Sequence, residues 1–371
     1  MQRARRKTAL ILSGGGARAA YQVGVLKAVA ELLPDRRTNP FPILCGTSAG
    51  AWNAVAMAAA AADFGAGVAR LASLWAGLHA GDIYRSGRLG LAGAAAGLAF
   101  GRAPRGLLDT APLRRMLEAL FDPVAIEAAI AAHALLAVSV TCSGYASGES
   151  VTFFQGRADL EPWRRSQRCG AHVKLSLDHV MASSAIPLVF PAVKLHREWF
   201  GDGAMRQQAP LSPAIRLGAE RVLVIGTGRM AADGERPDGQ AYPTPAQVAG
   251  HALSSIYVDT LSVDVERLIR VNRNLALIPE AVQHEHGMRL RHIDVLQISP
   301  SRRLDHLAAE HAEALPRSVR SLLRGIGGMA LEGGALTSCL LFEGAYTETL
   351  IALGYADAMA RRQELSAFLN S

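Results

Sequence analysis

The sequence predicts an α/β protein with a central, mostly parallel sheet, helices on both faces and a helical C-terminal extension. Short, continuously apolar runs alternate with helix-patterned segments from residue 8 onward, as in buried parallel strands joined by crossover helices. Half of the 371 residues are apolar and 19% are charged, so the chain can bury a large core. We expect one domain over residues 8–300, with helices over residues 301–371 packed on it.

The individual elements follow from the same patterns. The expected strands are short apolar runs bounded by turn residues, namely 7–12, 41–46, 133–142, 149–154, 220–228 and 292–301. The expected helices have apolar residues at helical spacing, namely 17–33, 48–62, 177–190, the long helical region 247–277 and the chain from residue 302 onward, with a looser helical region over 63–123. A hairpin is expected over residues 193–204.

The charge and hydropathy patterns exclude several function classes. Basic residues exceed acidic ones by seven, a mild excess that lies partly in the N-terminal run "MQRARRK". This run fits either a solvated tail or a contact with an anionic membrane surface, and its lack of aromatic residues argues against nucleic-acid binding. The apolar run that follows is too short for a signal peptide, and no stretch reaches the ~18 apolar residues of a membrane span. We therefore expect a cytoplasmic protein.

The cysteine and histidine patterns give no reason to expect a metal or a disulfide. The four cysteines form no C-x-x-C pair, so neither zinc nor a disulfide framework is supported. The sequence "HEH" at 284–286 offers two ligands around one residue, which is weak as a metal signal and fits a surface loop better. No cofactor and no metal are expected.

Residues 46–50 read "GTSAG", a G-x-S-x-G directly after an expected strand and at the start of an expected helix. This is the context of a nucleophile elbow, in which Ser48 occupies a sharp turn and its neighbours must be small. The helix N-terminus supplies backbone N–H groups and the positive end of a dipole. The alternative is a plain turn in which Ser48 only caps the helix.

The glycine-rich loop "SGGGAR" follows the first expected strand, and three functions compete for it. As a dinucleotide fingerprint it lacks an acidic residue at the end of the second strand, since Asp35 lies in the loop before that strand. As a phosphate-binding P-loop it lacks the Gly-Lys-Ser/Thr ending. As an oxyanion loop it fits, because Gly14, Gly15 and Gly16 can direct several N–H groups at a carbonyl oxygen that Ser48 attacks.

With both motifs in place, the sequence resembles the patatin-like phospholipases. That family has a glycine-rich loop with a basic residue, similar to "GGGAR" here, and a G-x-S-x-G about thirty residues later, similar to "GTSAG". Its third motif is a D-G-G or D-G-A turn, and "GDGA" at 201–204 matches it. The resemblance covers residues 8–300 and implies a three-layer patatin-like fold.

The resemblance also implies a catalytic Ser–Asp dyad. Ser48 is expected to be the nucleophile that forms an acyl-enzyme, and Asp202 to be its base. The expected activity is that of a lipid acyl hydrolase of the phospholipase A, lysophospholipase or esterase type. Its partner would be a lipid substrate, which implies peripheral contact with the inner face of the membrane.

Other residues of the expected site have supporting roles. The backbone of Ala49 is a further candidate donor to the oxyanion. Arg18 could anchor a phosphate, brace the loop, or lie solvated on a helix face. Ala19 replaces a glycine found in many members of the family, a change of one methyl group. The stretch 89–101 is expected to shape an acyl channel or touch the membrane.

Three alternatives remain open from the sequence. A Ser–Asp–His triad could use one of the histidines that follow Asp202, namely His251, His284, His286 and His292. An acyltransferase would form the same acyl-enzyme and pass it to an alcohol or thiol instead of water. A non-catalytic lipid-binding module would keep the fold alone.

Overall fold

The computed structural model describes the chain over residues 6–85, 106–228, 248, 260–279, 282–283, 290–325 and 334–370. The expected acyl-channel stretch 89–101 lies outside these residues, as does the first part of the helical region expected over 247–277.

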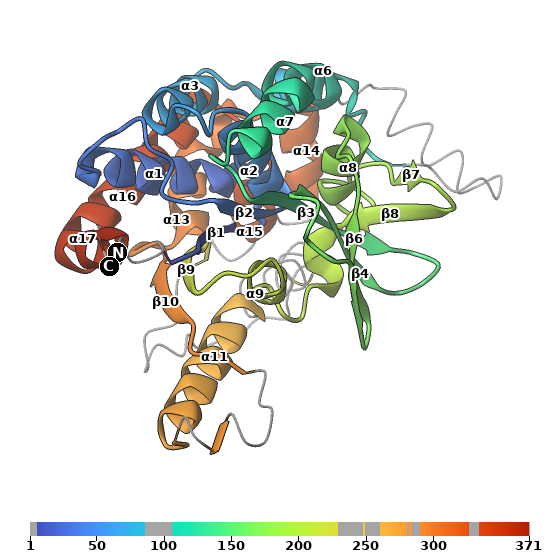
Figure 1. Cartoon of the computed structure of the whole chain (residues 1–371). Helices are drawn as coiled ribbons and strands as arrows, with labels where there is room; N and C mark the ends of the chain where they lie inside the picture. Colours follow the sequence, from blue (N-terminus) through green and yellow to red (C-terminus); the bar gives the residue numbers. More distant parts are fainter. Residues whose placement is uncertain are drawn as a thin grey trace.

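A single mixed sheet of ten strands organises the described residues, in the order β10-β9-β1-β2-β3-β4-β6-β5, with β8 paired to β3 and β7 to β8 (Figure 1). Five neighbouring strands, β10, β9, β1, β2 and β3, run parallel. Their bounds are β10 Asp294–Ile298, β9 Arg221–Ile225, β1 Thr8–Leu12, β2 Ile43–Thr47 and β3 Ala137–Gly144. The mostly parallel sheet that the sequence predicts is confirmed.

The other half of the sheet is antiparallel or mixed. β4 (Ser150–Gly156), a strand that the sequence predicts, pairs antiparallel with β3, and β6 (Arg168–His172) and β5 (Trp163–Arg165) extend the sheet beyond it. The expected hairpin forms from β7 (Val193–Leu195) and β8 (Glu198–Asp202). β8 then pairs with the end of β3, beyond the point where β2 has stopped. This pairing brings the end of the hairpin to the carboxyl edge of the parallel strands.

One face of the sheet carries most of the helices (Figure 1). The large apolar core between them and the sheet contains the fully buried Trp52, Trp75 and Tyr21. The first helices of this layer are η1 Gly16–Ala19, α1 Ala20–Leu32, α2 Ala49–Ala59, α3 Phe64–Ala76, α4 Ala80–Ile83, α6 Ala111–Leu120, α7 Pro123–Ala131 and α8 Leu177–Ser183.

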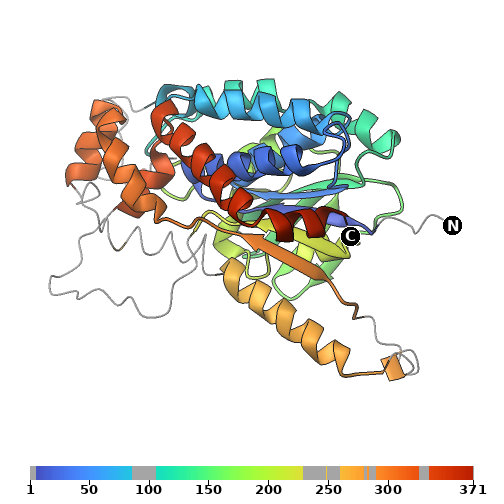
Figure 2. The ribbon, with the colours of Figure 1, turned by 90° about the vertical axis from the view of Figure 1, so that its left-hand side faces the viewer.

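A smaller core covers the opposite face. α9 (Ser212–Arg216) and α11 (Thr260–Ala276) lie there, and α11 projects below the sheet (Figure 2). Leu211 and Leu261 pack with alternate residues of β1 and β9 in this second cluster. Helices on both faces therefore make the fold three-layered, as predicted.

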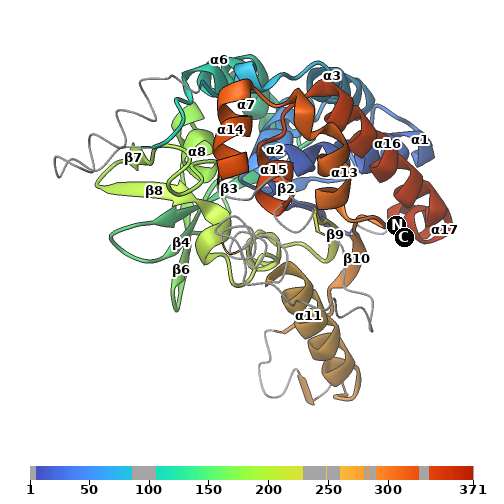
Figure 3. The same ribbon diagram turned by 180° about the vertical axis from the view of Figure 1, so that it is seen from behind.

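The chain after β10 is helical and returns to the first face (Figure 3). Its elements are α13 Leu304–His311, η4 Ala312–Ala314, α14 Arg317–Gly325, α15 Gly334–Leu340, α16 Gly344–Ala360 and α17 Arg362–Asn370. α16 packs tightly along α1: a Cβ at Gly24 would lie 2.0 Å from the Ile351 carbonyl oxygen, and one at Gly354 would lie 2.1 Å from that of Tyr21. None of the described helices combines the length and apolarity that a bilayer span requires.

Two sequence predictions differ from the structure. The helix expected over 177–190 ends at Ser183, because Pro187 disfavours helical backbone before it and the chain must extend toward β7. The sequence does not predict the strands β5 and β6, since both are short and partly exposed and have little apolar alternation.

Candidate active site

Ser48 occupies the turn between β2 and α2, at the carboxyl edge of the parallel strands. Its backbone has φ 55° and ψ −132°, a sparsely populated conformation that costs about 1–3 kcal/mol. Close packing holds the turn in place, because a Cβ at Gly50 would lie 2.2 Å from the Leu12 carbonyl oxygen at the end of β1. The G-x-S-x-G sequence thus forms a strained strand-to-helix corner that presents the serine side chain.

Asp202 lies beside Ser48 because β8 continues the sheet where β2 has ended, with Asp202 paired to Cys142 of β3. Ser48 Oγ donates a hydrogen bond to Asp202 Oδ2 at 2.6 Å. The Ala204 N–H donates to the other carboxylate oxygen at 3.0 Å. Ser48 is 2% exposed and Asp202 is fully buried, so water is largely excluded from their contact and the attraction between them is strengthened.

Two ionisable side chains near Asp202, the Cys142 thiol and the Tyr145 phenol, are uncharged at neutral pH. Burial raises the pKa of the Cys142 thiol well above its usual range, and the negative charge of Asp202 raises it further. Burial, and then the same charge, raise the pKa of the Tyr145 phenol. Both groups therefore stay protonated, and neither competes with Ser48 as a nucleophile.

Ser183, at the end of α8, fixes the strained backbone of the turn. Its hydroxyl accepts a hydrogen bond from the Ser48 N–H at 2.9 Å and donates one to the Thr141 carbonyl oxygen at 2.6 Å. Ser183 is fully buried, so both backbone groups depend on it for a partner. Ser183 lies within a helix that the sequence predicts, and no motif marks it as a site residue. The only local signal is the pair of serines in "ASSAIP".

The glycine loop follows β1 and enters η1. Gly15 and Gly16 have φ 154° and 58°, values that favour glycine. A Cβ at Gly16 would lie 2.2 Å from the Cys339 carbonyl oxygen of α15, so the loop is pressed against a helix more than 300 residues later. Ala49 is the first residue of α2, and its N–H is among those that lack an acceptor within the helix.

Arg18 braces the loop and is not solvated. Its side chain is buried, and its guanidinium donates to Ser338 Oγ and to the Ala335 carbonyl oxygen, both at 2.7 Å. Both acceptors belong to α15. Of the three roles considered for Arg18, this geometry supports the loop brace.

A buried polar network lies behind the loop and joins α1, α2 and α3. Trp75 Nε1 donates to Asn53 Oδ1 at 2.8 Å, and Asn53 Nδ2 donates to Gln22 Oε1 at 2.9 Å. Gln22 Nε2 in turn donates to the Ser13 carbonyl oxygen at 2.7 Å. This chain sets the start of the glycine loop relative to both helices. Its signal in the sequence is a polar residue among apolar neighbours, Gln22 in "AYQVGV" and Asn53 in "AWNAVA".

The histidine alternatives separate into two groups. His251, His284 and His286 lie outside the described residues. His292 precedes β10 and contacts Asp294 at 3.2 Å, which places it at the amino edge of the parallel strands, opposite Ser48. Across the ranges that the structure describes, no three histidine, cysteine or carboxylate side chains gather as a metal would require.

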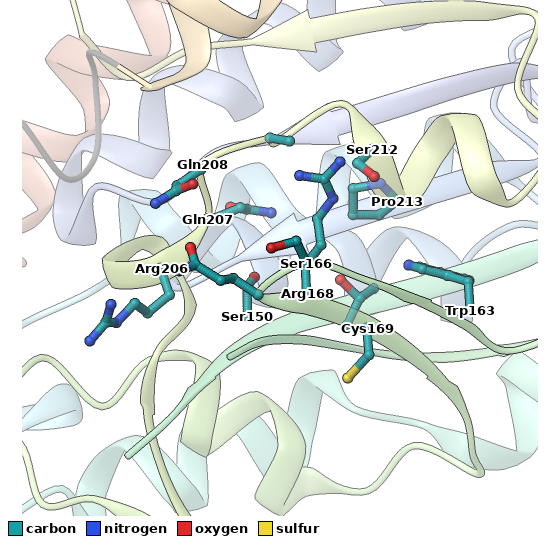
Figure 4. A pocket seen from close by; sticks show the side chains of 13 residues that line it. Ser150, Trp163, Ser166, Arg168, Cys169, Arg206, Gln207, Gln208, Ser212 and Pro213 are labelled. Carbon is teal, nitrogen blue, oxygen red and sulfur yellow. The ribbon is translucent and has the colours of Figure 1, made fainter. Parts of the chain in front are cut away.

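A small polar cavity lies between α9 and the β4–β6 edge, with Arg168 and Gln208 among its lining residues (Figure 4). Gln207 lines it and also reaches the turn before the nucleophile. Thr47 Oγ1 donates to Gln207 Oε1 at 2.9 Å, and Gln207 Nε2 donates to Thr141 Oγ1 at 3.3 Å. Thr47, the residue before Ser48, is thus also held by a side chain on the face of the sheet that α9 covers.

One family of known proteins matches more than half of the chain. A family model described as patatin-like phospholipase matches residues 10–215, a range that contains the glycine loop, Ser48 and Asp202. The chain is similar to the crystal structure of VipD from Legionella pneumophila, at 13% identity and a TM-score of 0.32, over 91% of this chain and 67% of that one. A search of curated proteins gives no match.

Proposed function

The chain belongs to the patatin-like phospholipase family, whose members are lipid acyl hydrolases, and from that premise we propose that Ser48 and Asp202 form a dyad that cleaves carboxylic esters of lipids. The observation that carries the proposal is the 2.6 Å hydrogen bond from Ser48 Oγ to Asp202 Oδ2. A nucleophile and its base must be within such reach for the proton to move as the bond to substrate forms.

The first half-reaction makes an acyl-enzyme. Ser48 Oγ attacks the ester carbonyl carbon while its proton passes to Asp202 Oδ2. The resulting oxyanion is stabilised by backbone N–H groups of Gly14, Gly15 and Gly16 and by that of Ala49 at the start of α2. The tetrahedral intermediate then expels the alcohol, which takes the proton from Asp202.

The second half-reaction returns the free enzyme. Water attacks the acyl carbonyl carbon and gives a proton to Asp202. Collapse of the second tetrahedral intermediate releases the fatty acid, and the proton on Asp202 returns to Ser48 Oγ. Since Ser48 is only 2% exposed, an ester reaches Oγ only after neighbouring groups move aside. Because the proposed substrates are lipid esters, a lipid surface is the expected source of the substrate.

The test is ester hydrolysis by matched variants. Wild type, Ser48→Ala and Asp202→Asn are assayed on a chromogenic short-chain ester and on phospholipid vesicles, with fatty-acid release measured by mass spectrometry. The controls are Ser73→Ala and Asp159→Asn, which alter exposed residues.

We expect Ser48→Ala to abolish turnover and Asp202→Asn to reduce it about 10²–10⁴-fold, the usual contribution of general acid–base catalysis. The controls should retain wild-type rates. Full activity in the Asp202→Asn variant would exclude the dyad. Product that appears only as an ester of an added alcohol would identify an acyltransferase.

A further inference from the structure

Thr227 lies against the glycine loop although it is more than 200 residues away in sequence. It follows the end of β9, is 1% exposed, and donates a hydrogen bond from Oγ1 to the Gly14 carbonyl oxygen at 2.5 Å. A Cβ built on Gly15 would lie 2.6 Å from the same Oγ1 atom. The threonine hydroxyl therefore contacts the peptide unit that joins Gly14 to Gly15.

The strand order tells which way this peptide unit faces. β1 lies between β9 and β2 in the sheet. The loop after β1 is therefore flanked by Thr227, which follows β9, and by Ser48, which follows β2. In a planar trans peptide the C=O and the N–H point in opposite directions, and none of the described peptide bonds is cis. Since the Gly14 carbonyl points to the β9 side, the Gly15 N–H points to the β2 side, where Ser48 lies.

We propose that Thr227 is a positioning residue of the oxyanion site, which holds the Gly14–Gly15 peptide so that the Gly15 N–H faces Ser48. This inference rests on the proposed function of Ser48. Thr227 does not itself contact the substrate. It acts through the loop, because two successive glycines leave the peptide free to rotate when nothing holds its carbonyl.

Within the described residues, the other contacts hold the two ends of the loop but not this peptide. Ser13 bonds the Ile225 carbonyl oxygen through both its N–H and its hydroxyl, at 3.4 and 3.2 Å. The Arg18 N–H donates to the Gly15 carbonyl oxygen at 3.2 Å. The Gly14 carbonyl is the remaining group that sets the direction of the Gly15 N–H, and the Thr227 hydroxyl is its partner.

Thr227→Val tests this role because it keeps the shape of the side chain and removes the hydroxyl. Thr227→Ser restores the hydroxyl without the methyl group. The matched control is Thr347→Val in α16: Thr347 is fully buried and donates to the Trp75 carbonyl oxygen at 2.6 Å. That control loses a buried hydrogen bond to a backbone carbonyl outside the glycine loop.

The assay is steady-state hydrolysis of a soluble chromogenic ester, with kcat and KM determined separately and urea unfolding measured for each variant. Loss of a whole oxyanion donor lowers kcat about 10²–10³-fold. Thr227→Val retains the donor but not its orientation, so we expect kcat to fall about 10–100-fold with KM changed little. Thr227→Ser should recover most of kcat, and Thr347→Val should keep it while losing stability.

Two results would overturn the inference: a wild-type kcat in Thr227→Val, or an equal fall in kcat in Thr347→Val. If Thr227→Val does not fold, Thr227→Ala and Thr227→Ser give the same comparison, since they differ by one oxygen atom. A wild type that hydrolyses no ester and takes no fluorophosphonate label would instead defeat the proposed function. The two failures are therefore distinguishable.

Discussion

Removal of the Ser183 hydroxyl should weaken both the fold and the reactivity of Ser48. In the Ser183→Ala variant, the Ser48 N–H and the Thr141 carbonyl each lose their hydrogen-bond partner, at 2.9 and 2.6 Å in the structure. A buried polar group left without a partner costs about 1–3 kcal/mol. Because two such groups lose their partner and the structure around them can relax in part, we expect the free energy of unfolding to fall by about 2–4 kcal/mol.

The effect on reactivity follows from the strained turn. Ser48 holds φ 55° and ψ −132°, a conformation that persists only when its surroundings enforce it. Without the bond to Ser183, the turn can relax and Ser48 Oγ moves away from the geometry that meets Asp202. We expect the rate of labelling by a fluorophosphonate to fall about 10-fold or more, because small displacements of a reacting atom are costly.

The next residue provides the control. Ser184 is also buried and has two hydrogen bonds, accepting from Trp52 Nε1 at 2.7 Å and donating to the Val180 carbonyl oxygen at 2.9 Å. Ser184→Ala should lose similar stability in urea but keep the wild-type labelling rate. The reasoning is refuted if Ser183→Ala labels like wild type, or if both variants slow equally.

Three further predictions concern the loop, its brace and a buried histidine. Gly16→Ala places a Cβ at φ +58° and 2.2 Å from the Cys339 carbonyl oxygen, so little folded protein should elute on size-exclusion chromatography; Gly81→Ala, with nothing within 4 Å, should fold normally. Arg18→Met loses two 2.7 Å hydrogen bonds and should lower the free energy of unfolding in urea by about 2–4 kcal/mol; an unchanged value would show that Arg18 is no brace. Burial lowers the pKa of His179 from 6.5 to about 4. Between pH 6.5 and pH 4 the His179 imidazole is therefore protonated in the unfolded chain but neutral in the folded one. The free energy of unfolding should fall as the pH drops from 7 to 5, by up to about 2 kcal/mol. His179→Phe should remove that part of the pH dependence, and an identical pH profile in the variant would contradict the assignment.

The order of the main elements could be predicted because it depends on local signals. The apolar runs at β1 and β2 and the glycines after them mark strand–turn–helix units within about 30 residues each. β6 could not be predicted in this way. Its sequence "RCGAH" has no run of large apolar residues and is partly exposed, and it becomes a strand only because the edge of β4 is available for pairing.

The site shows the same division between local and distant information. Ser48 and the glycine loop are recognisable from short motifs, and the family resemblance points to Asp202. The sequence leaves the role of Arg18 among three alternatives and gives none to Ser183 or Thr227, because each has a decisive partner that lies 135 to 320 residues away in sequence. Such contacts arise from the packing of distant elements, which no local pattern encodes.

The central claim is that Ser48, activated by Asp202, is the reacting nucleophile. The most direct test is labelling with a fluorophosphonate, followed by peptide mapping and by rate measurement on wild type and Asp202→Asn. The account predicts a single adduct on Ser48 and a labelling rate at least about 100-fold lower in Asp202→Asn. An adduct on another residue, or an undiminished rate without the carboxylate, would contradict it.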